Sequence, residues 1–486
     1  MLGRRFFQRG HAGVATASLT PEPANLQRLA PWGLVAVLMG AGALAVNAWL
    51  APDAEHDVAP SAAAITTEAP SLLTSAMAKI QGDPTPSVSG LVPQPISDDA
   101  LAQTLPKLGR AEARLIGVYH LIGQARPREA LREAEALVRD HPNFQLAQLV
   151  LGDLLTMQTR PVGQLGDVAD TKALAAGEQL KELREQSRRR LMALTERPPE
   201  GSVPTQFLTL ATQSRHAIAV DASRSRLYLF ENTKASNSGE GTKPGSRMKL
   251  VADYYISVGL SGVDKLIEGD LRTPLGVYYI TSSLDPNKLP DLYGAGALPI
   301  NYPNALDLKR GKTGSGIWLH GSPSEQFARP PQASEGCVVL SNPDLQSLLA
   351  KVSIRTTPVV IASELHWVQP EALDLDRQQF QESLEAWRSL KSAGDLEQLK
   401  ALYSDRFTIQ GQKLADWWPR VESEIKSKGS RELQIKDLSV LQWRDQDQTM
   451  VVTFGEVAEG ARRGTTKRQY WIREDAQWKI FYEGPV

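Results

Sequence analysis

The sequence is poor in cysteine, in net charge and in clustered metal ligands. Its 486 residues include one cysteine, Cys337, so an internal disulfide is excluded. Lys and Arg number 54 against 55 Asp and Glu, and this balance gives no electrostatic basis for a nucleic-acid partner. Neither an HExxH nor a CxxC motif occurs, so no metal site and no cofactor is expected. The lone thiol is the feature that needs an explanation.

The N-terminal segment predicts that the chain leaves the cytoplasm. Residues 1–31 are basic, and residues 32–51 ("WGLVAVLMGAGALAVNAWLA") are apolar except for Asn47. About 20 apolar residues suffice for a helix to cross a bilayer, and a basic flank stays inside. We therefore expect a cytoplasmic N-terminus, a single-pass signal anchor in the inner membrane and a periplasmic catalytic part. The alternatives are a cleaved signal peptide that leaves a soluble periplasmic protein, and a buried core helix.

The next two segments differ in composition. Residues 52–98 are rich in Ala, Pro, Ser and Thr and have few large apolar side chains, which predicts a flexible linker. Residues 99–195 have helical spacing, and Ala130, Ala134 and Pro142 occupy positions typical of a tetratricopeptide (TPR) repeat. We expect either a TPR-like unit or an ordinary helical hairpin. Both could provide a surface for a homodimer or for a protein partner.

Residues 214–364 contain short β-rich runs such as "HAIAVD", "SRLYLFEN" and "TPVVIA", separated by turn residues. This pattern predicts a mainly-β domain, built as a sandwich or a barrel-like sheet. Residues 375–486 begin with helical spacing and end in alternating strands, which resembles an NTF2-like α+β cone. Like the helical unit, such a domain could provide a surface for a homodimer or for a protein partner. The chain is therefore expected to be multidomain.

Cys337 lies in a segment suited to a nucleophile. It belongs to "SEGCVVLSN" and follows a strand-like "IWLHG" that ends in His320 and Gly321. Gly336 lets the backbone turn sharply and approach a substrate. A thiol of ordinary pKa needs a neighbouring imidazole to become a good nucleophile. The other six of the seven histidines lie in the tail, the linker, the helical unit or the rims of the β domain, so His320 is the best candidate base. The alternative is an inert buried cysteine.

Four segments together resemble the catalytic domain of the YkuD-type L,D-transpeptidases, whose signature is a strand-borne His-Gly followed by a Ser/Thr-His-Gly-Cys turn. They are "KLIEGDLRTPLGVYYI" (265–280), "LPINYPNALD" (298–307), "GIWLHG" (316–321) and "SEGCVVLSNPDL" (334–345). With the C-terminal unit they are similar to the YafK branch of this family and to the related cell-shape L,D-carboxypeptidases of Gram-negative bacteria. The resemblance implies a mainly-β catalytic domain between the helical unit and the NTF2-like domain.

The resemblance also implies roles for individual residues. Cys337 would be the nucleophile and His320 its base, and the carbonyl of Gly321 would hold the imidazole tautomer. Backbone amides of Gly336 and Cys337 would form the oxyanion hole.

The turn that carries the thiol departs from the family pattern at two positions. Ser334 and Glu335 are expected to contact substrate, but Glu335 stands where the family usually has histidine, and Val339 stands where it commonly has arginine. A carboxylate pointing toward the thiol would raise the thiol pKa. Activation would then depend more heavily on His320.

The implied reaction is cleavage of the diaminopimelate to D-Ala bond in peptidoglycan tetrapeptide stems, through an acyl-cysteine. Water as acceptor would give L,D-carboxypeptidase activity or release of a wall-linked lipoprotein, and an amine would give transpeptidation. Glu335 and the extra NTF2-like unit favour hydrolysis. A noncatalytic cell-wall-binding scaffold is the alternative from another class. A papain-like protease is disfavoured because no "CGSCW" surrounds the thiol.

Overall fold

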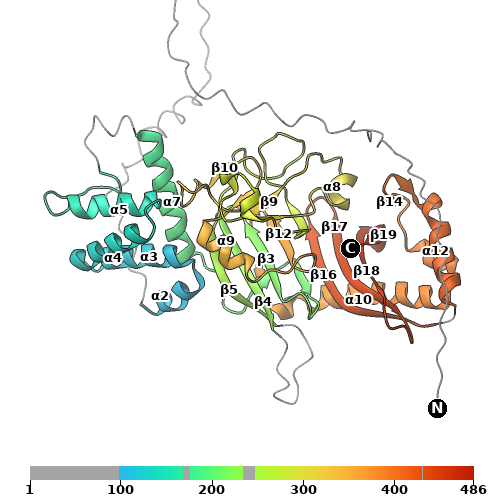
Figure 1. The fold of residues 1–486 in the computed structure, drawn as a ribbon. Helices are drawn as coiled ribbons and strands as arrows, with labels where there is room; N and C mark the ends of the chain where they lie inside the picture. Colours follow the sequence, from blue (N-terminus) through green and yellow to red (C-terminus); the bar gives the residue numbers. More distant parts are fainter. Residues whose placement is uncertain (1–97, 168–175, 234–246, 430) are drawn as a thin grey trace, which may run out of the picture. The chain divides into compact units, whose positions relative to one another are not determined.

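The computed structural model describes residues 98–167, 176–233, 247–429 and 431–486 (Figure 1). The expected cytoplasmic N-terminus, membrane anchor and nearly all of the expected linker lie outside these residues. Within the described part of the chain, no helix is long and apolar enough to cross a membrane.

The described chain begins with a helical unit. In α4 a proline occupies the first turn, where its missing N–H costs no hydrogen bond. Ala130, Ala134 and Leu137 lie on one face of α4 and are buried, and they join a hydrophobic cluster shared by the neighbouring helices. The unit contains α2 (Asp98–Thr104), η2 (Leu105–Lys107), α3 (Arg110–Gly123), α4 (Pro127–Asp140), α5 (Gln145–Thr156) and α7 (Gly177–Thr195).

A mixed five-stranded sheet with the order β5-β4-β3-β12-β7 forms the base of the middle domain. Strand β12 runs parallel to β3, and the other pairs are antiparallel. Alternate residues of β3 enter two different hydrophobic clusters, so both faces of the sheet are covered. The strands are β3 (His216–Asp221), β4 (Arg226–Thr233), β5 (Arg247–Tyr255), β7 (Gly276–Tyr279) and β12 (Pro358–Ala362).

A second, three-stranded sheet with the order β11-β9-β8 shares one hydrophobic core with the first. The expected mainly-β middle domain is therefore confirmed, and its two sheets enclose a common core as in a sandwich. The remaining elements of this domain are β6 (Val258–Gly259), η3 (Pro286–Lys288), η4 (Asp291–Tyr293), β8 (Ala297–Pro299), α8 (Ala305–Lys309), β9 (Trp318–His320), β10 (Gln332–Ser334), β11 (Val338–Val339) and α9 (Asn342–Leu349).

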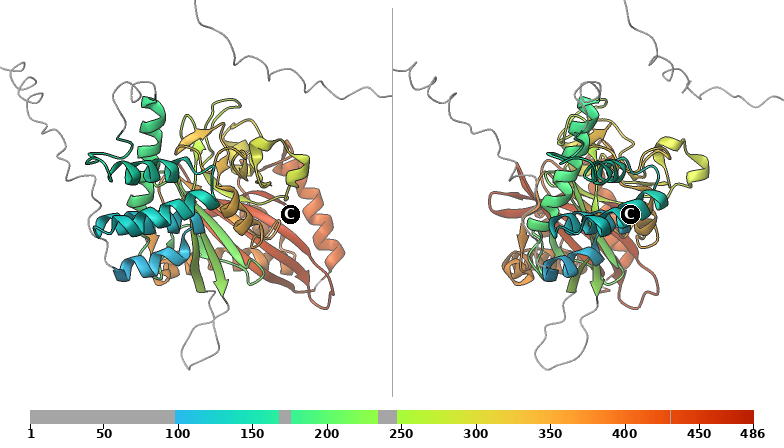
Figure 2. Two further views of the ribbon diagram at one scale, coloured as in Figure 1. Left: turned by 60° about the vertical axis from the view of Figure 1, so that its left-hand side comes forward. Right: turned by 90° about the vertical axis from the view of Figure 1, so that its left-hand side faces the viewer.

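The C-terminal domain combines helices with a long antiparallel sheet of order β19-β18-β17-β16-β2, whose strands β16–β19 are orange to red in Figure 2. This confirms the expected α+β architecture. Its edge strand β2 comes from a segment that precedes the middle domain. The elements are β2 (Phe207–Thr209), η5 (Pro370–Leu373), α10 (Asp374–Ala393), α11 (Leu396–Ala401), β14 (Thr408–Ile409), β15 (Gln412–Lys413), α12 (Leu414–Lys428), β16 (Leu433–Arg444), β17 (Gln448–Ala458), β18 (Thr465–Glu474) and β19 (Gln477–Pro485).

Buried ion pairs join the helical unit to the middle domain. Arg226 of β4 has a fully buried side chain, which donates to Glu112 of α3 at 2.7 Å and to Asp253 of β5 at 2.5 Å. Removing one partner from such a pair would leave a buried charge uncompensated. The helical unit is therefore tied to the sheet by polar contacts as well as by apolar packing.

Candidate active site

Strand pairing brings the expected base and nucleophile together. Strands β9 and β11 are parallel, with Val339 opposite His320 and Val338 opposite Leu319. Cys337 immediately precedes β11, and side chains two residues apart in an extended strand lie on the same face. The Cys337 side chain therefore lies on the face of Val339, diagonal to His320.

The imidazole of His320 is held in a defined tautomer. Nδ1 lies 2.7 Å from the carbonyl oxygen of Gly321, and because a carbonyl can only accept, Nδ1 carries the proton and Nε2 is free to accept one. The ring of Tyr293 packs edge-on, with centroids 5.1 Å apart. Burial lowers the pKa of His320 to about 4, with a smaller contribution from the charge of Arg329, while the hydrogen bond to the Gly321 carbonyl opposes the shift. At neutral pH the imidazole is neutral, as a general base requires.

Close packing explains the glycine after His320. A Cβ at Gly321 would lie 2.1 Å from Oδ1 of Asn342. The Asn342 side chain accepts from the amide of Ala295 at 2.8 Å and donates to the carbonyl of Ser322 at 2.9 Å. Asn342, the first residue of α9, thus fixes the backbone that carries the Gly321 carbonyl. No local sequence pattern marks Asn342 as a functional residue.

The thiol of Cys337 is partly accessible and is not ionised by its surroundings. Its Sγ contacts the carbonyl oxygen of Gly316 at 3.6 Å, and among the described residues no hydrogen bond joins Sγ to the imidazole. Burial raises the pKa of the thiol, and the Glu335 carboxylate adds to the rise, while the backbone of Trp318 and, to a smaller extent, the charges of Arg329 and Lys265 oppose it. The resting pair is therefore a protonated thiol beside a neutral imidazole.

The turn before the thiol is shaped by its own hydrogen bonds. Gly336 has φ +124°, and a Cβ there would lie 2.7 Å from the carbonyl oxygen of Arg272, so only glycine fits. The Ser334 hydroxyl donates to the Cys337 carbonyl at 2.6 Å and accepts from the Gly336 amide at 3.1 Å. The Gly336 amide thus already has an acceptor, which leaves the Cys337 amide as the freer of the two expected oxyanion donors. Ser334 is 3% exposed and supports the turn, and its expected contact with substrate stays a prediction.

The two departures from the family pattern have different environments. Glu335 is exposed beside the thiol, whereas Val339 is 2% exposed within β11. A positive charge nevertheless reaches the site from Arg329, which lies in the loop between His320 and Cys337. Burial lowers the pKa of this guanidinium, and the nearby Cys337 and Glu335 oppose that shift. Sequence reasoning missed Arg329 because its proximity to the thiol depends on the path of the loop.

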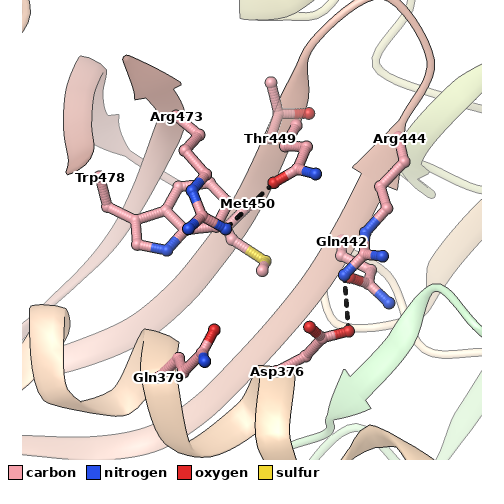
Figure 3. A pocket seen from close by; sticks show the side chains of 9 residues that line it. Asp376, Gln379, Gln442, Arg444, Thr449, Met450, Arg473 and Trp478 are labelled. Carbon is pink, nitrogen blue, oxygen red and sulfur yellow. Dashed lines mark hydrogen bonds and ion pairs between the residues drawn. The ribbon is translucent and has the colours of Figure 1, made fainter. Parts of the chain in front are cut away.

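The C-terminal domain holds two polar clusters, a pocket and a buried charged network. A pocket on the C-terminal domain lies between α10 and the sheet, and Figure 3 shows Arg444 reaching Asp376, an ion pair of 2.6 Å. Its lining consists of Asp376, Gln379, Gln442, Arg444, Gln448, Thr449, Met450, Arg473 and Trp478. Within the described ranges, no group of three or more His, Cys, Asp or Glu side chains is placed to hold a metal ion.

A self-paired network of six charges lies inside the C-terminal domain. Lys391 contacts Glu456 at 2.9 Å and Glu424 at 3.2 Å, and Lys467 contacts Glu483 at 3.2 Å. Glu483 also accepts from Tyr403 at 2.9 Å and from Gln469 at 2.8 Å. The members are Lys391, Lys428, Lys467, Glu424, Glu456 and Glu483.

Comparison with known families agrees with this architecture. Residues 215–361 match the L,D-transpeptidase catalytic domain, YkuD, and residues 379–484 match the Cds6 C-terminal NTF2-like domain. The chain therefore carries an L,D-transpeptidase catalytic domain followed by an NTF2-like domain.

Two solved structures are similar over somewhat more than half of this chain. The structure of Bdellovibrio bacteriovorus Bd1075 is 26% identical, covers 59% of this chain and 99% of its own, and has a TM-score of 0.48. The helical cell shape determining protein Pgp2 from Campylobacter jejuni is 20% identical, with coverage of 57% and 95% and a TM-score of 0.44. The comparison with curated proteins gave no match.

Proposed function

We propose that this chain is a peptidoglycan-modifying cysteine enzyme that cleaves the diaminopimelate to D-Ala bond of tetrapeptide stems. The observation that carries the proposal is the pairing of β9 with β11, which places a buried neutral His320 diagonal to Cys337 inside a matched L,D-transpeptidase catalytic domain. The activity belongs in the periplasm, with residues 32–51 as an inner-membrane anchor.

The geometry supports a two-step acyl transfer. Nε2 of His320 takes the thiol proton as Sγ of Cys337 attacks the carbonyl carbon, and the Cys337 amide faces the developing oxyanion. The imidazolium, stabilised by the Gly321 carbonyl at Nδ1, gives its proton to the amine of the leaving D-Ala. In the second step the imidazole takes a proton from the acceptor, whose attack on the acyl-cysteine releases the thiol.

Hydrolysis is the favoured outcome. Glu335 is exposed on the turn that carries the thiol, where its carboxylate can orient a water molecule or repel the carboxylates of an acceptor stem. The expected products are a tripeptide stem and free D-Ala. Release of a wall-linked lipoprotein is the same reaction on a different leaving group.

The test is incubation of the full chain with purified tetrapeptide muropeptide and mass analysis of the products. We expect tripeptide and D-Ala from the wild type, no product from Cys337→Ala, and a covalent carbapenem adduct on the wild type alone. Thermal unfolding of Cys337→Ala should match the wild type, because a partly accessible turn residue contributes little packing. Turnover by Cys337→Ala would overturn the assignment, and a product dominated by dimers would reverse only the choice of acceptor.

A noncatalytic scaffold is the second candidate, and the raised pKa of Cys337 is the observation in its favour. It predicts sedimentation of the chain with intact sacculi, no turnover of muropeptide and no carbapenem adduct. The two candidates are therefore separated by the same mass measurement.

A further inference from the structure

The loop that joins His320 to Cys337 is attached to the helical unit. Phe327, near the middle of this loop, is 6% exposed and belongs to the hydrophobic cluster of the helical unit. Its ring stacks on Phe144, with centroids 4.1 Å apart and an interplanar angle of 21°. A loop residue of the catalytic domain is therefore anchored in the core of another unit.

Backbone hydrogen bonds hold the same loop from the α4–α5 turn. The amide of Phe327 donates to the carbonyl of Asn143 at 3.0 Å, and Nδ2 of Asn143 donates to the carbonyl of Ser324 at 2.9 Å. A single residue thus binds the loop at two points. These bonds hold a segment that has no strand partner there among the described residues.

The chain beyond Phe327 is fixed as it approaches the thiol. The carbonyl of Arg329 accepts from the hydroxyl of Tyr255 at 3.0 Å, and Nη1 of Arg329 lies 3.4 Å from the carbonyl of Ala333. The guanidinium of Arg190, from α7, lies over the Tyr255 ring at 3.7 Å. Contacts that begin on the helical unit therefore continue to the turn that carries Cys337.

We propose that Asn143 and Phe144 are positioning residues of the active site, which hold the loop so that Cys337 and Arg329 keep their places beside His320. The inference rests on the proposed function and deepens it. Because no hydrogen bond joins the thiol to the imidazole in the described structure, their alignment depends on the turn and the loop. A misplacement of about 1 Å can cost roughly 100-fold in rate.

The test uses the full chain with Asn143→Ala and, as a matched control, Gln148→Ala. Gln148, in the first turn of α5, also donates a side-chain amide hydrogen bond to the α4–α5 turn, at the carbonyl of Pro142. Since Cys337 is the only cysteine, iodoacetamide labels it alone, and its rate can be followed against pH. For Asn143→Ala we expect kcat on tetrapeptide muropeptide to fall about tenfold with KM changed less than about twofold. The pH midpoint of the alkylation rate should also shift in Asn143→Ala. Gln148→Ala should change neither kcat nor this midpoint.

A second variant, Phe327→Leu, keeps an apolar side chain but removes the ring stacking, and it should reproduce both effects. If kcat and the alkylation profile were unchanged in both Asn143→Ala and Phe327→Leu, the proposal would be overturned, even if the thermal midpoint of these variants fell. Equal losses in Gln148→Ala would also overturn it, because they would reflect only the stability of the helical unit. If the wild type shows no turnover, the proposed function fails, while the alkylation profile still tests the positioning role.

Discussion

The catalytic turn and the interior of the C-terminal domain both bury ionisable groups, but they treat them in opposite ways. Inside the C-terminal domain, each carboxylate of the charged network contacts at least one lysine, and Glu483 also accepts from Tyr403 and Gln469. At the turn that carries Cys337, the imidazole of His320 has one hydrogen bond within the described structure, to its neighbouring carbonyl. Fully partnered charges favour a single rigid arrangement, whereas a sparsely partnered pair keeps its proton affinity available for chemistry.

The pKa shifts express the same difference. Burial is the main influence on His320 and lowers its pKa to about 4. Burial alone would raise the pKa of Glu483, but Lys467 and Lys391 hold it below its ordinary value. Desolvation thus decides the state of the catalytic imidazole, and partner charges decide the state of the network.

The largest expected effect is on catalysis. His320→Gln preserves much of the side-chain volume but removes the proton acceptor, so kcat should fall by about 10²- to 10⁴-fold. The measurement is steady-state turnover of tetrapeptide muropeptide. His216→Gln is the control, since His216 lies on β3, in the other sheet. An equal loss in the control would show that the wrong imidazole has been assigned.

A matched experiment on the charged network should change stability instead. Lys391→Met leaves three carboxylates facing two lysines, and this buried excess of negative charge should lower the free energy of unfolding by about 3–5 kcal/mol, as measured by urea denaturation. Lys426→Met, at an exposed position of α12, should change it by less than about 0.5 kcal/mol. Turnover by the folded fraction should remain. If Lys391→Met left the free energy of unfolding unchanged, the charged network would not be a stabilising element of the domain.

The pH dependence of kcat/KM sharpens the comparison further. The imidazole accepts a proton only when it is neutral, and the pKa of His320 is about 4 instead of 6.5. Activity should therefore persist at pH 5 and be lost as the pH falls through about 4. The measurement is a pH-rate profile of the wild type. It is restricted to pH values at which the circular dichroism spectrum is unchanged. An acid limb near 6.5 would indicate that the imidazole is hydrated.

The smallest expected effect concerns the exposed carboxylate. The charge of Glu335 contributes to the raised pKa of Cys337, so Glu335→Gln should lower that pKa and increase the thiolate fraction at a fixed pH. Because the side chain is exposed to solvent and salt, we expect the rate of iodoacetamide alkylation to rise only about two- to threefold at low ionic strength. Glu325→Gln, exposed on the same loop, is the control. A slower reaction in Glu335→Gln would reverse the sign assigned to this charge.

Much of the fold was predictable from local patterns. The run from His216 to Asp221 and the long alternating segments near the C-terminus form strands as expected. Helix α12 was missed because Pro419 lies inside it, and proline normally signals the end of a helix. Strand β2 was missed because three residues are too few to show alternation, and its partner lies far away in the sequence.

The candidate pair, Cys337 and His320, could be singled out from the sequence because its residues carry distinctive chemistry in a short motif, and its catalytic role stays a prediction. The surroundings were not, since Tyr293, Arg329 and Asn342 reach the site through loops and packing that no local pattern specifies. The internal bonding of the turn was also not predictable: the Gly336 amide donates to the Ser334 hydroxyl. Hydrogen bonds of this kind depend on backbone angles that composition does not determine.

Strand β2 has a mechanical consequence. The chain contributes β2 to the C-terminal sheet before it builds the catalytic domain, with Leu441 opposite Phe207. The short strands β1 (Val203–Pro204) and β13 (Trp367–Val368) pair with each other at the two ends of that domain. The catalytic domain is thus inserted between β2 and the rest of the C-terminal domain, and two chain segments connect them. Rotation about a single linker could therefore not separate the two domains. A C-terminal fragment that begins at residue 375 would lack β2, so one edge of β16 would be unpaired. Unpaired strand edges of this kind tend to pair with other chains.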